Sequence, residues 1–420
     1  MIIIIFLLIL LAILGTPLFA VMGAGGLIAS YSADLSPSNL IIEMYRLVSQ
    51  PSLVAIPLFT FAGMILSCGG GSKRLIKLFN ALLGWMPGGL AIVTIVTCSA
   101  FTAFTGASGV TIIALGGLLY PLLEHANYRD RFCLGLLTTS GSLGLLFPPS
   151  MAILLYGIVS GVNIDELFLS GVIPGLLLLF MLSVFSIFSA RKFHVPTHEF
   201  SLKEIFSAIR CCIWDIMLPI LIFTGIFGGF VTITEVAALT AAYVLFVETV
   251  IAKKIHIIKD LPRIMIDTTA LVGSILIILG IAMGLTNLLI DSQLPMKLLA
   301  IVEQNIDSQL QFLILLNIFL LIVGAMMDIF SAIVVVVPLI LPLAVRYNID
   351  PVHLGIIFLA NLEIGYMTPP VGINLFIASQ RFGQPILKLF KSTFPFLIIM
   401  LLWLGLITYF PLLSTWWQQF

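Results

Sequence analysis

The sequence predicts an all-α polytopic membrane protein, built as an inverted repeat with two re-entrant hairpins and two broken helices. Of its 420 residues, 60% are hydrophobic and only 9% are charged, whereas a globular domain carries about 25% charged residues. Two membrane-length apolar segments are each interrupted by adjacent prolines, Pro148-Pro149 and Pro369-Pro370. The formal net charge is zero, so nothing supports binding to a polyanion such as nucleic acid.

The two interruptions occupy equivalent places in the two halves of the chain. Residues 341–376 are broken at Gly365 and the second proline pair, and residues 120–150 at Gly144 and the first pair. A shift of 221 positions superposes these breaks, and also Gly63 on Gly284, Pro121 on Pro342, Leu122 on Leu343 and Asn127 on Asn348. Proline opens a helix interior, and opened backbone survives in hydrocarbon only where it is buried in protein or lines a polar cavity. Paired broken helices therefore indicate the binding site of a secondary transporter.

The first half of the chain begins with residues 1–50, which we interpret as a first membrane helix and its connection. Residues 51–190 form the first repeat, in which residues 72–89 have the spacing of a helix lying along the membrane interface. A hairpin follows over residues 91–123, because each arm is too short to cross a hydrocarbon core about 30 Å thick. The first broken helix covers residues 132–160.

The second half repeats this order after a linking loop and two uninterrupted spans within residues 191–260. Residues 261–420 form the second repeat, with a hairpin over 311–343 whose tip lies at 324–332. The second broken helix covers residues 354–380.

Loop charges predict the orientation of the repeats. If the first hairpin enters from the cytoplasm, the cytoplasmic loops hold Arg129, Arg131, Arg191, Lys192, Lys203, Arg210, Lys253, Lys254, Lys259, Arg263, Arg381, Lys388 and Lys391. The opposite loops hold Asp165, Glu166, Glu235, Asp291, Glu303, Asp307 and Asp350, with only Lys297 and Arg346 as cations. Cytoplasmic loops are enriched in lysine and arginine, so the two hairpins are expected to enter from opposite faces. The orientation of the N-terminus stays open.

Small polar residues gather at both hairpins and both broken helices. The first hairpin and its broken helix carry Thr105, Ser108, Thr111, Thr138, Thr139, Ser140, Ser142 and Ser150. The second hairpin and its broken helix carry Asp328, Ser331, Asn361, Glu363, Thr368 and Asn374. Sodium prefers hard oxygen ligands such as hydroxyls and unwound carbonyls, and half-helix ends add their dipoles. A single hydroxyl commonly bonds its own i−4 carbonyl and a single glycine permits close helix packing, but grouping at four helix breaks favours a binding site.

Two acidic residues sharpen this hypothesis. An ionisable group at membrane depth marks an ion or substrate pathway by default, and Asp328 is such a group. Glu363 equally suits a structural pairing with a neighbour such as Asn361. The sequence contains no HExxH, Walker loop or GxGxxG after a strand, so we expect neither an enzyme nor an ATP-driven pump.

Thr368 immediately precedes the second proline pair. Proline keeps its predecessor out of the helical region, so we expect the Thr368 hydroxyl and the Gly365 carbonyl to be free to face the hairpin tip at Gly324.

The sequence resembles the DctM-like large membrane subunit of tripartite ATP-independent periplasmic (TRAP) transporters over essentially the whole chain. The motifs that carry this resemblance are IPLFTFAGMIL (56–66), GWMPGGLAIV (84–93), FTGASGVTIIALGG (104–117), GSLGLLFPPS (141–150), GAMMDIFSAIVVVVPLILP (324–342) and IGYMTPPVGINLF (364–376).

The resemblance implies an elevator-type, sodium-driven importer of small organic anions such as C4-dicarboxylates, multi-pass in the lipid bilayer of a bacterial inner membrane. A periplasmic binding protein would deliver the substrate, and a small four-helix membrane subunit would complete the scaffold. Sodium ions are the only cofactor implied. By motif, the first sodium site would use Thr105, Ser108, Gly144 and Pro148, the second Gly324, Gly365 and Thr368, and substrate or coupling would involve Ser142, Ser150, Asp328 and Asn374. The family often has Ser-Gly-Ser at the first tip, where this chain has Thr105-Gly106-Ala107.

Two alternatives remain at this point. A stand-alone sodium/dicarboxylate symporter of similar inverted-repeat design would need no binding protein. The other alternative is a non-transporting scaffold or a channel subunit. A channel would need a continuous polar stripe through several helices, whereas the polar residues here concentrate at the breaks. The sequence does not specify which organic anion, how many sodium ions or which oligomeric state.

Overall fold

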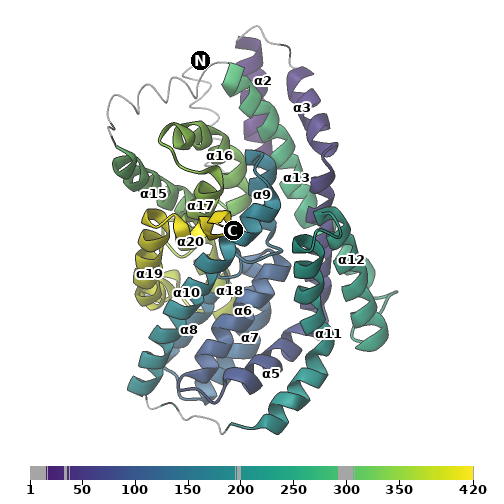
Figure 1. Ribbon diagram of the computed structural model, residues 1–420, viewed down its shortest axis with the longest axis vertical. Helices are drawn as coiled ribbons and strands as arrows, with labels where there is room; N and C mark the ends of the chain where they lie inside the picture. The colour runs from purple at the N-terminus through teal and green to yellow at the C-terminus, as the bar shows by residue number, and fades with distance from the viewer. Residues whose placement is uncertain are drawn as a thin grey trace.

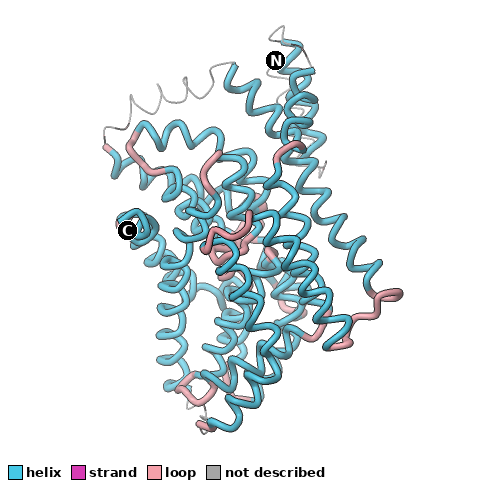
Figure 2. Tube along the Cα trace, turned by 45° about the vertical axis from the view of Figure 1, so that its right-hand side comes forward, coloured by secondary structure: helices cyan, strands magenta, loops and turns pink. Residues whose placement is uncertain are grey.

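The computed structural model describes residues 16, 18–32, 36, 38–193, 195, 200–291, 306 and 308–419. Within these residues it is helical, without strands (Figure 2). Nine of the described helices are long and apolar enough to cross a membrane, which confirms the prediction of an all-α polytopic membrane protein. Most of the predicted first membrane helix lies outside the described residues, and so do residues 292–305 and 307 before the second hairpin.

The start of the described chain differs from the expected semi-polar connection. It forms two helices, α2 (Leu18–Ser32) and α3 (Ser38–Val48), which both pack on α13 (Leu261–Asp291). The reason is an apolar stripe on α3: Leu47 is buried, and a Cβ added at Gly280 would lie 3.2 Å from Met44 Cγ. Residues three apart share a helix face, so α3 has an apolar side that α13 covers.

The first repeat contains the first predicted hairpin and the first predicted broken helix. Its elements are the 3-10 turn Pro51–Val54, α4 (Ala55–Cys68), α5 (Gly71–Leu83), α6 (Gly89–Thr105), α7 (Ser108–His125), α8 (Asp130–Ser140), α9 (Met151–Ser160) and α10 (Ile164–Phe193). The hairpin predicted over 91–123 corresponds to α6 and α7, which contact each other. The expectation that each arm is too short to cross the membrane is wrong for α7, whose 18 residues are long and apolar enough to do so. The broken helix predicted over 132–160 corresponds to α8 and α9, separated by ten residues without regular helix.

The second half has a matching series. Two helices precede it, α11 (Leu202–Phe227) and α12 (Ile233–Phe246), the latter continued by a π-helical turn, Val247–Ile251. After α13 come α15 (Gln309–Met326), α16 (Ile329–Arg346), α17 (Pro351–Gly365), α18 (Ile373–Phe382), α19 (Ile386–Tyr409), α20 (Leu412–Thr415) and the 3-10 turn Trp416–Gln419. The hairpin predicted over 311–343 corresponds to α15 and α16, and the broken helix predicted over 354–380 to α17 and α18.

The two halves interlock around the helix breaks. Helices α3, α11, α12 and α13 lie along the right-hand side of the molecule in Figure 1. In the rest of the molecule α7 packs on α18, and α16 packs on α9. Each hairpin therefore contacts the second part of the other half's broken helix. Figure 2 shows loops within the body of the molecule as well as at its ends.

Candidate functional site

The first hairpin tip is a tight reversal between α6 and α7. Gly106 adopts φ 65°, a left-handed conformation, and its N–H donates to the Thr102 carbonyl. A Cβ added at Gly106 would lie 2.8 Å from Met151 Cβ, so the tip lies directly against the first residue of α9. Thr105, the last residue of α6, is buried and its hydroxyl has no hydrogen-bond partner among the described residues.

The first helix break lies against α6. A Cβ added at Gly144 would lie 2.2 Å from the Ser99 carbonyl oxygen and 2.5 Å from the Ala103 nitrogen, so glycine is required for main chain to contact main chain here. Pro148 and Phe104 line the same cavity of about 320 Å³. The structure thus brings the predicted residues of the first sodium set into one region around the end of α6.

The second hairpin and its break make an equivalent contact. A Cβ added at Gly365 would lie 2.4 Å from the Gly324 carbonyl carbon, so α15 and α17 also touch backbone to backbone. The Ala325 carbonyl accepts hydrogen bonds from the N–H groups of Val371 (3.1 Å) and Gly372 (3.2 Å). These bonds fasten the segment after the proline pair to the end of α15.

The expectation that the oxygens at Thr368 and Gly365 are free is wrong. The Thr368 N–H donates to the Gly365 carbonyl at 2.9 Å, and the Thr368 hydroxyl donates to the Ile364 carbonyl at 3.1 Å. The physical reason is that the chain continues in a hydrogen-bonded turn to the residue before Pro369, which satisfies these groups locally. Each oxygen keeps lone pairs for a further partner.

The two acidic candidates have different surroundings. Asp328 caps α16, because its carboxylate accepts from the Ser331 N–H at 3.0 Å and the Ser331 hydroxyl at 2.5 Å. Glu363 is fully buried, and neither of its carboxyl oxygens has a hydrogen-bond partner among the described residues. It does not pair with Asn361, whose amide donates instead to Asn317 Oδ1 at 2.7 Å.

Asn374 joins the two halves at the breaks. Its backbone N–H donates to the Tyr366 carbonyl, in the second break, at 3.1 Å. Its side-chain Oδ1 accepts from the Ser108 hydroxyl, in the first hairpin, at 2.8 Å. Its Nδ2 is buried and has no acceptor within the part of the chain that the structure describes, so a hydrogen-bond donor is available where the two repeats meet.

The remaining candidates are buried hydroxyls of the first broken helix. The Ser142 hydroxyl donates to the Thr139 carbonyl at 3.3 Å. The hydroxyl of Ser150, the N-cap residue of α9, makes no capping bond and has no partner among the described residues. Among the described residues of the first hairpin tip and the first break, the buried side-chain oxygens without a partner include those of Thr105, Thr139, Ser140 and Ser150. Since buried polar groups in proteins are nearly always hydrogen-bonded, this group is suited to binding a ligand.

The donor set fits a hard monovalent cation better at the first break than at the second. Thr105 supplies an uncommitted buried hydroxyl oxygen beside main chain that is irregular at both the tip and the break. At the second break the Thr368 hydroxyl proton and the Ala325 carbonyl are already engaged within the protein. Residues that fit sodium are therefore present at both breaks, and the first break has more buried hydroxyl groups without a hydrogen-bond partner.

The sequence as a whole matches one family of transporters. Residues 2–413 match the model of "Tripartite ATP-independent periplasmic transporter, DctM component". This chain belongs to the DctM family. This family is that of a transporter component, which is consistent with the expectation from the sequence that the chain is not an enzyme.

Relatives of this DctM-family chain align over nearly their whole length. It is 34% identical to the C4-dicarboxylate TRAP transporter large permease protein DctM of Pseudomonas aeruginosa, over 91% of this chain and 90% of that protein. It is 31% identical to the ectoine TRAP transporter large permease protein TeaC of Halomonas elongata, over 96% of this chain and 95% of that protein. Among solved structures, the YdaH transporter of Alcanivorax borkumensis is 14% identical and has a TM-score of 0.64, covering 96% of this chain and 97% of that one. That likeness concerns the fold alone.

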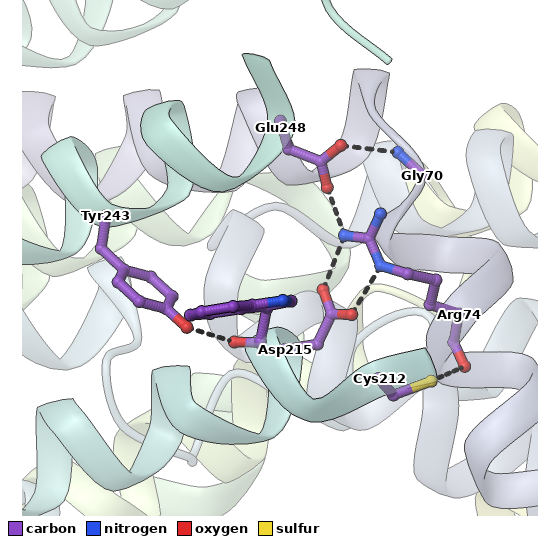
Figure 3. A network of polar contacts seen from close by, with 7 residues as sticks. Gly70, Arg74, Cys212, Asp215, Tyr243 and Glu248 are labelled. Carbon is purple, nitrogen blue, oxygen red and sulfur yellow. Dashed lines mark hydrogen bonds and ion pairs between the residues drawn. The ribbon is translucent and has the colours of Figure 1, made fainter. Parts of the chain in front are cut away.

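The sequence reasoning missed a buried ion network in this DctM-family chain (Figure 3). Arg74 on α5 donates to both carboxylate oxygens of Asp215 on α11, at 2.6 and 2.8 Å, and also pairs with Glu248 in the π-helical turn. Glu248 in turn accepts from the Gly70 N–H at 3.1 Å. Burial alone lowers the pKa of Arg74, but the hydrogen bonds to both carboxylates raise it above its ordinary value. A signal was present, because acidic residues inside apolar spans need a partner.

Proposed function

We propose that this chain is the large membrane subunit of a TRAP transporter in a bacterial inner membrane, and that it imports a small organic anion together with sodium. The relatives named for C4-dicarboxylate and ectoine transport support a small carboxylate-bearing substrate. The observation that carries the proposal is the convergence of unpaired buried polar groups where the hairpins meet the breaks, with Asn374 bonded to both halves.

The chemistry of these groups suits an anion accompanied by sodium. The buried Nδ2 of Asn374 offers a donor to a carboxylate oxygen, and the hydroxyls of Ser142 and Ser150 come from the broken helix beside the first tip. Thr105, Ser108, Gly144 and Pro148 would hold one sodium ion, and Gly324, Gly365 and Thr368 a second, through hydroxyl and main-chain oxygens. Bound sodium would supply positive charge beside the substrate. Asp328 adds an acidic group at the second tip.

We further propose that the two halves are inverted repeats that move as an elevator. The shift of 221 residues maps α7 (Ser108–His125) onto α16 (Ile329–Arg346) at both ends. It also pairs Asn127 (φ 63°) with Asn348 (φ 56°), the two asparagines with positive φ. The asymmetry of the loop charges supports opposite orientations of the two hairpins.

The partners follow from the tripartite family: a small membrane subunit and a periplasmic binding protein. The test is uptake of radiolabelled succinate and of ectoine into proteoliposomes that contain this chain and the small subunit from the same genome. Uptake is expected only with an inward sodium gradient and the loaded binding protein. Robust uptake by this chain alone would support the stand-alone symporter instead. Sodium-independent uptake would remove sodium coupling from the proposal.

A further inference from the structure

A basic cleft of about 530 Å³ lies outside the transport site, between the beginning of α8, the end of α10 and the beginning of α19. It is lined by Arg129, Arg131, Phe132, Phe185, Phe188, Ser189, Lys192, Lys391, Ser392, Pro395 and Phe396. We propose that this cleft binds an anionic phospholipid, with the phosphate at the cations and an acyl chain along the phenylalanines.

Helix geometry places the cations and the aromatic rings at two depths. Lys192 is the last residue of the candidate span Ile164–Lys192, and Lys391 lies near the start of the candidate span Ile386–Tyr409. Phe188 precedes Lys192 by four residues, and Pro395 follows Lys391 by four, so each lies one turn further into its span. The lysines therefore lie at the level of the lipid headgroups and the apolar residues at the level of the chains.

The cleft is basic, and three of its four cations are not paired with a carboxylate of the described residues. None of its lining residues is acidic, and among the described residues Arg131, Lys192 and Lys391 have no carboxylate within 4 Å. The neighbouring Asp130 is engaged elsewhere, by Lys388 Nζ at 2.7 Å and the Tyr120 hydroxyl at 2.7 Å. Basic pockets between membrane helices on the cytoplasmic side are suited to anionic headgroups.

The apolar part of the cleft distinguishes a lipid from a free anion. Phe132, Phe185 and Phe396 form a packed aromatic base with ring centroids 5.1 to 6.3 Å apart. Phe188 stays 65% exposed beside it. A free inorganic anion would use the cations and leave the exposed Phe188 ring uncovered, whereas a phospholipid matches both parts.

The test is native mass spectrometry of the detergent-purified chain with added cardiolipin, phosphatidylglycerol or phosphatidylcholine. Each cation near an anionic lipid changes affinity about fivefold. The triple variant Arg131→Gln, Lys192→Gln, Lys391→Gln is therefore expected to bind cardiolipin and phosphatidylglycerol about a hundredfold more weakly. Phosphatidylcholine should bind weakly to both proteins. The matched control Lys203→Gln, Lys253→Gln, Lys259→Gln removes three exposed cations outside the cleft and should bind anionic lipid as the native chain does.

A second variant distinguishes a bound lipid from a free phosphate ion. It also keeps the proposal testable if the triple variant folds poorly. Phe188→Ser alters a ring that is mostly exposed, so the core is left intact, and it should weaken cardiolipin binding severalfold. Equal cardiolipin binding by the native chain and both cleft variants would overturn the proposal. So would displacement of cardiolipin by millimolar inorganic phosphate, because that result identifies a site for the free anion.

Discussion

Thr105 and Thr368 have the same proposed role but differ in what their hydroxyl groups already bind. The Thr105 hydroxyl is buried with no partner among the described residues, whereas the Thr368 hydroxyl donates to the carbonyl four residues earlier. Both oxygens keep their lone pairs for a cation, but only the Thr105 hydroxyl still has its proton to donate to a further group.

For the first tip, we expect Thr105→Val to raise the sodium concentration for half-maximal uptake by about tenfold, because a hydrogen-bonding or charge contact of this kind contributes roughly 1.5 kcal/mol or more. Thr105→Ser keeps the oxygen and should stay close to the native chain. Uptake against a sodium titration in proteoliposomes measures both. An unchanged half-saturation in Thr105→Val would exclude this hydroxyl from the site.

For the second break, we expect Thr368→Val to weaken the sodium dependence of uptake without loss of assembly with the small subunit, and Thr368→Ser to retain most activity. The matched control is Thr269→Val, which removes an exposed threonine hydroxyl with the same i−4 hydrogen bond, 2.8 Å to the Met265 carbonyl. Uptake is measured against a sodium titration in proteoliposomes, and assembly with the small subunit is measured in parallel after detergent extraction. Loss of assembly in Thr368→Val alone would assign the residue a structural role.

At the scale of the elements, glycines set how closely the hairpins approach the broken helices. We expect Gly365→Ala to destabilise the protein by about 1–3 kcal/mol through overpacking and to reduce uptake, because the new Cβ would lie 2.4 Å from Gly324 main chain. The control is Gly405→Ala in α19, where a Cβ meets nothing within 4 Å. That change should be neutral or stabilise by up to about 1 kcal/mol. Thermal unfolding in detergent distinguishes the two, and equal melting temperatures would contradict the close contact.

The element pattern could be predicted from sequence because proline and glycine act locally. The proline pairs at 148 and 369 locate both breaks, since a proline disrupts the helix whatever surrounds it. The start of α3 was not predicted as helix, because its stability comes from packing on α13, more than two hundred residues away. For the same reason the bond between Ser108 and Asn374 could not be predicted: each residue was a candidate, but only the fold brings positions 266 apart into contact.

At the scale of the whole molecule, the Arg74 network holds α5 to α11 and to the turn after α12. We expect Arg74→Leu to reduce the free energy of unfolding by about 3–5 kcal/mol, because it leaves two buried carboxylates without their cation. The control Arg263→Leu removes an arginine that is 87% exposed and 3.9 Å from Asp267, and should cost less than about 1 kcal/mol. The melting temperatures of the two variants are measured in detergent. Similar values would contradict the contribution of the network to stability.

The orientation of the whole chain is also testable. A cysteine replacing Asn163 should react with an impermeant thiol reagent from the periplasm, and one replacing Lys203 should not, because the loop charges place these positions on opposite sides. Both belong in a Cys68→Ser, Cys211→Ser background, since these two native cysteines are exposed. The reverse labelling pattern would contradict the inverted arrangement.

The contact between Gly324 and Gly365 has a mechanical consequence. Between most packed helices, side chains can change rotamer and so absorb a small displacement of one helix relative to the other. Here two main chains touch with no side chain between them, and neither has a rotamer to change. A displacement of the end of α15 toward α17 must therefore be transmitted as a translation of the α17 backbone, together with the segment that the Ala325 carbonyl holds.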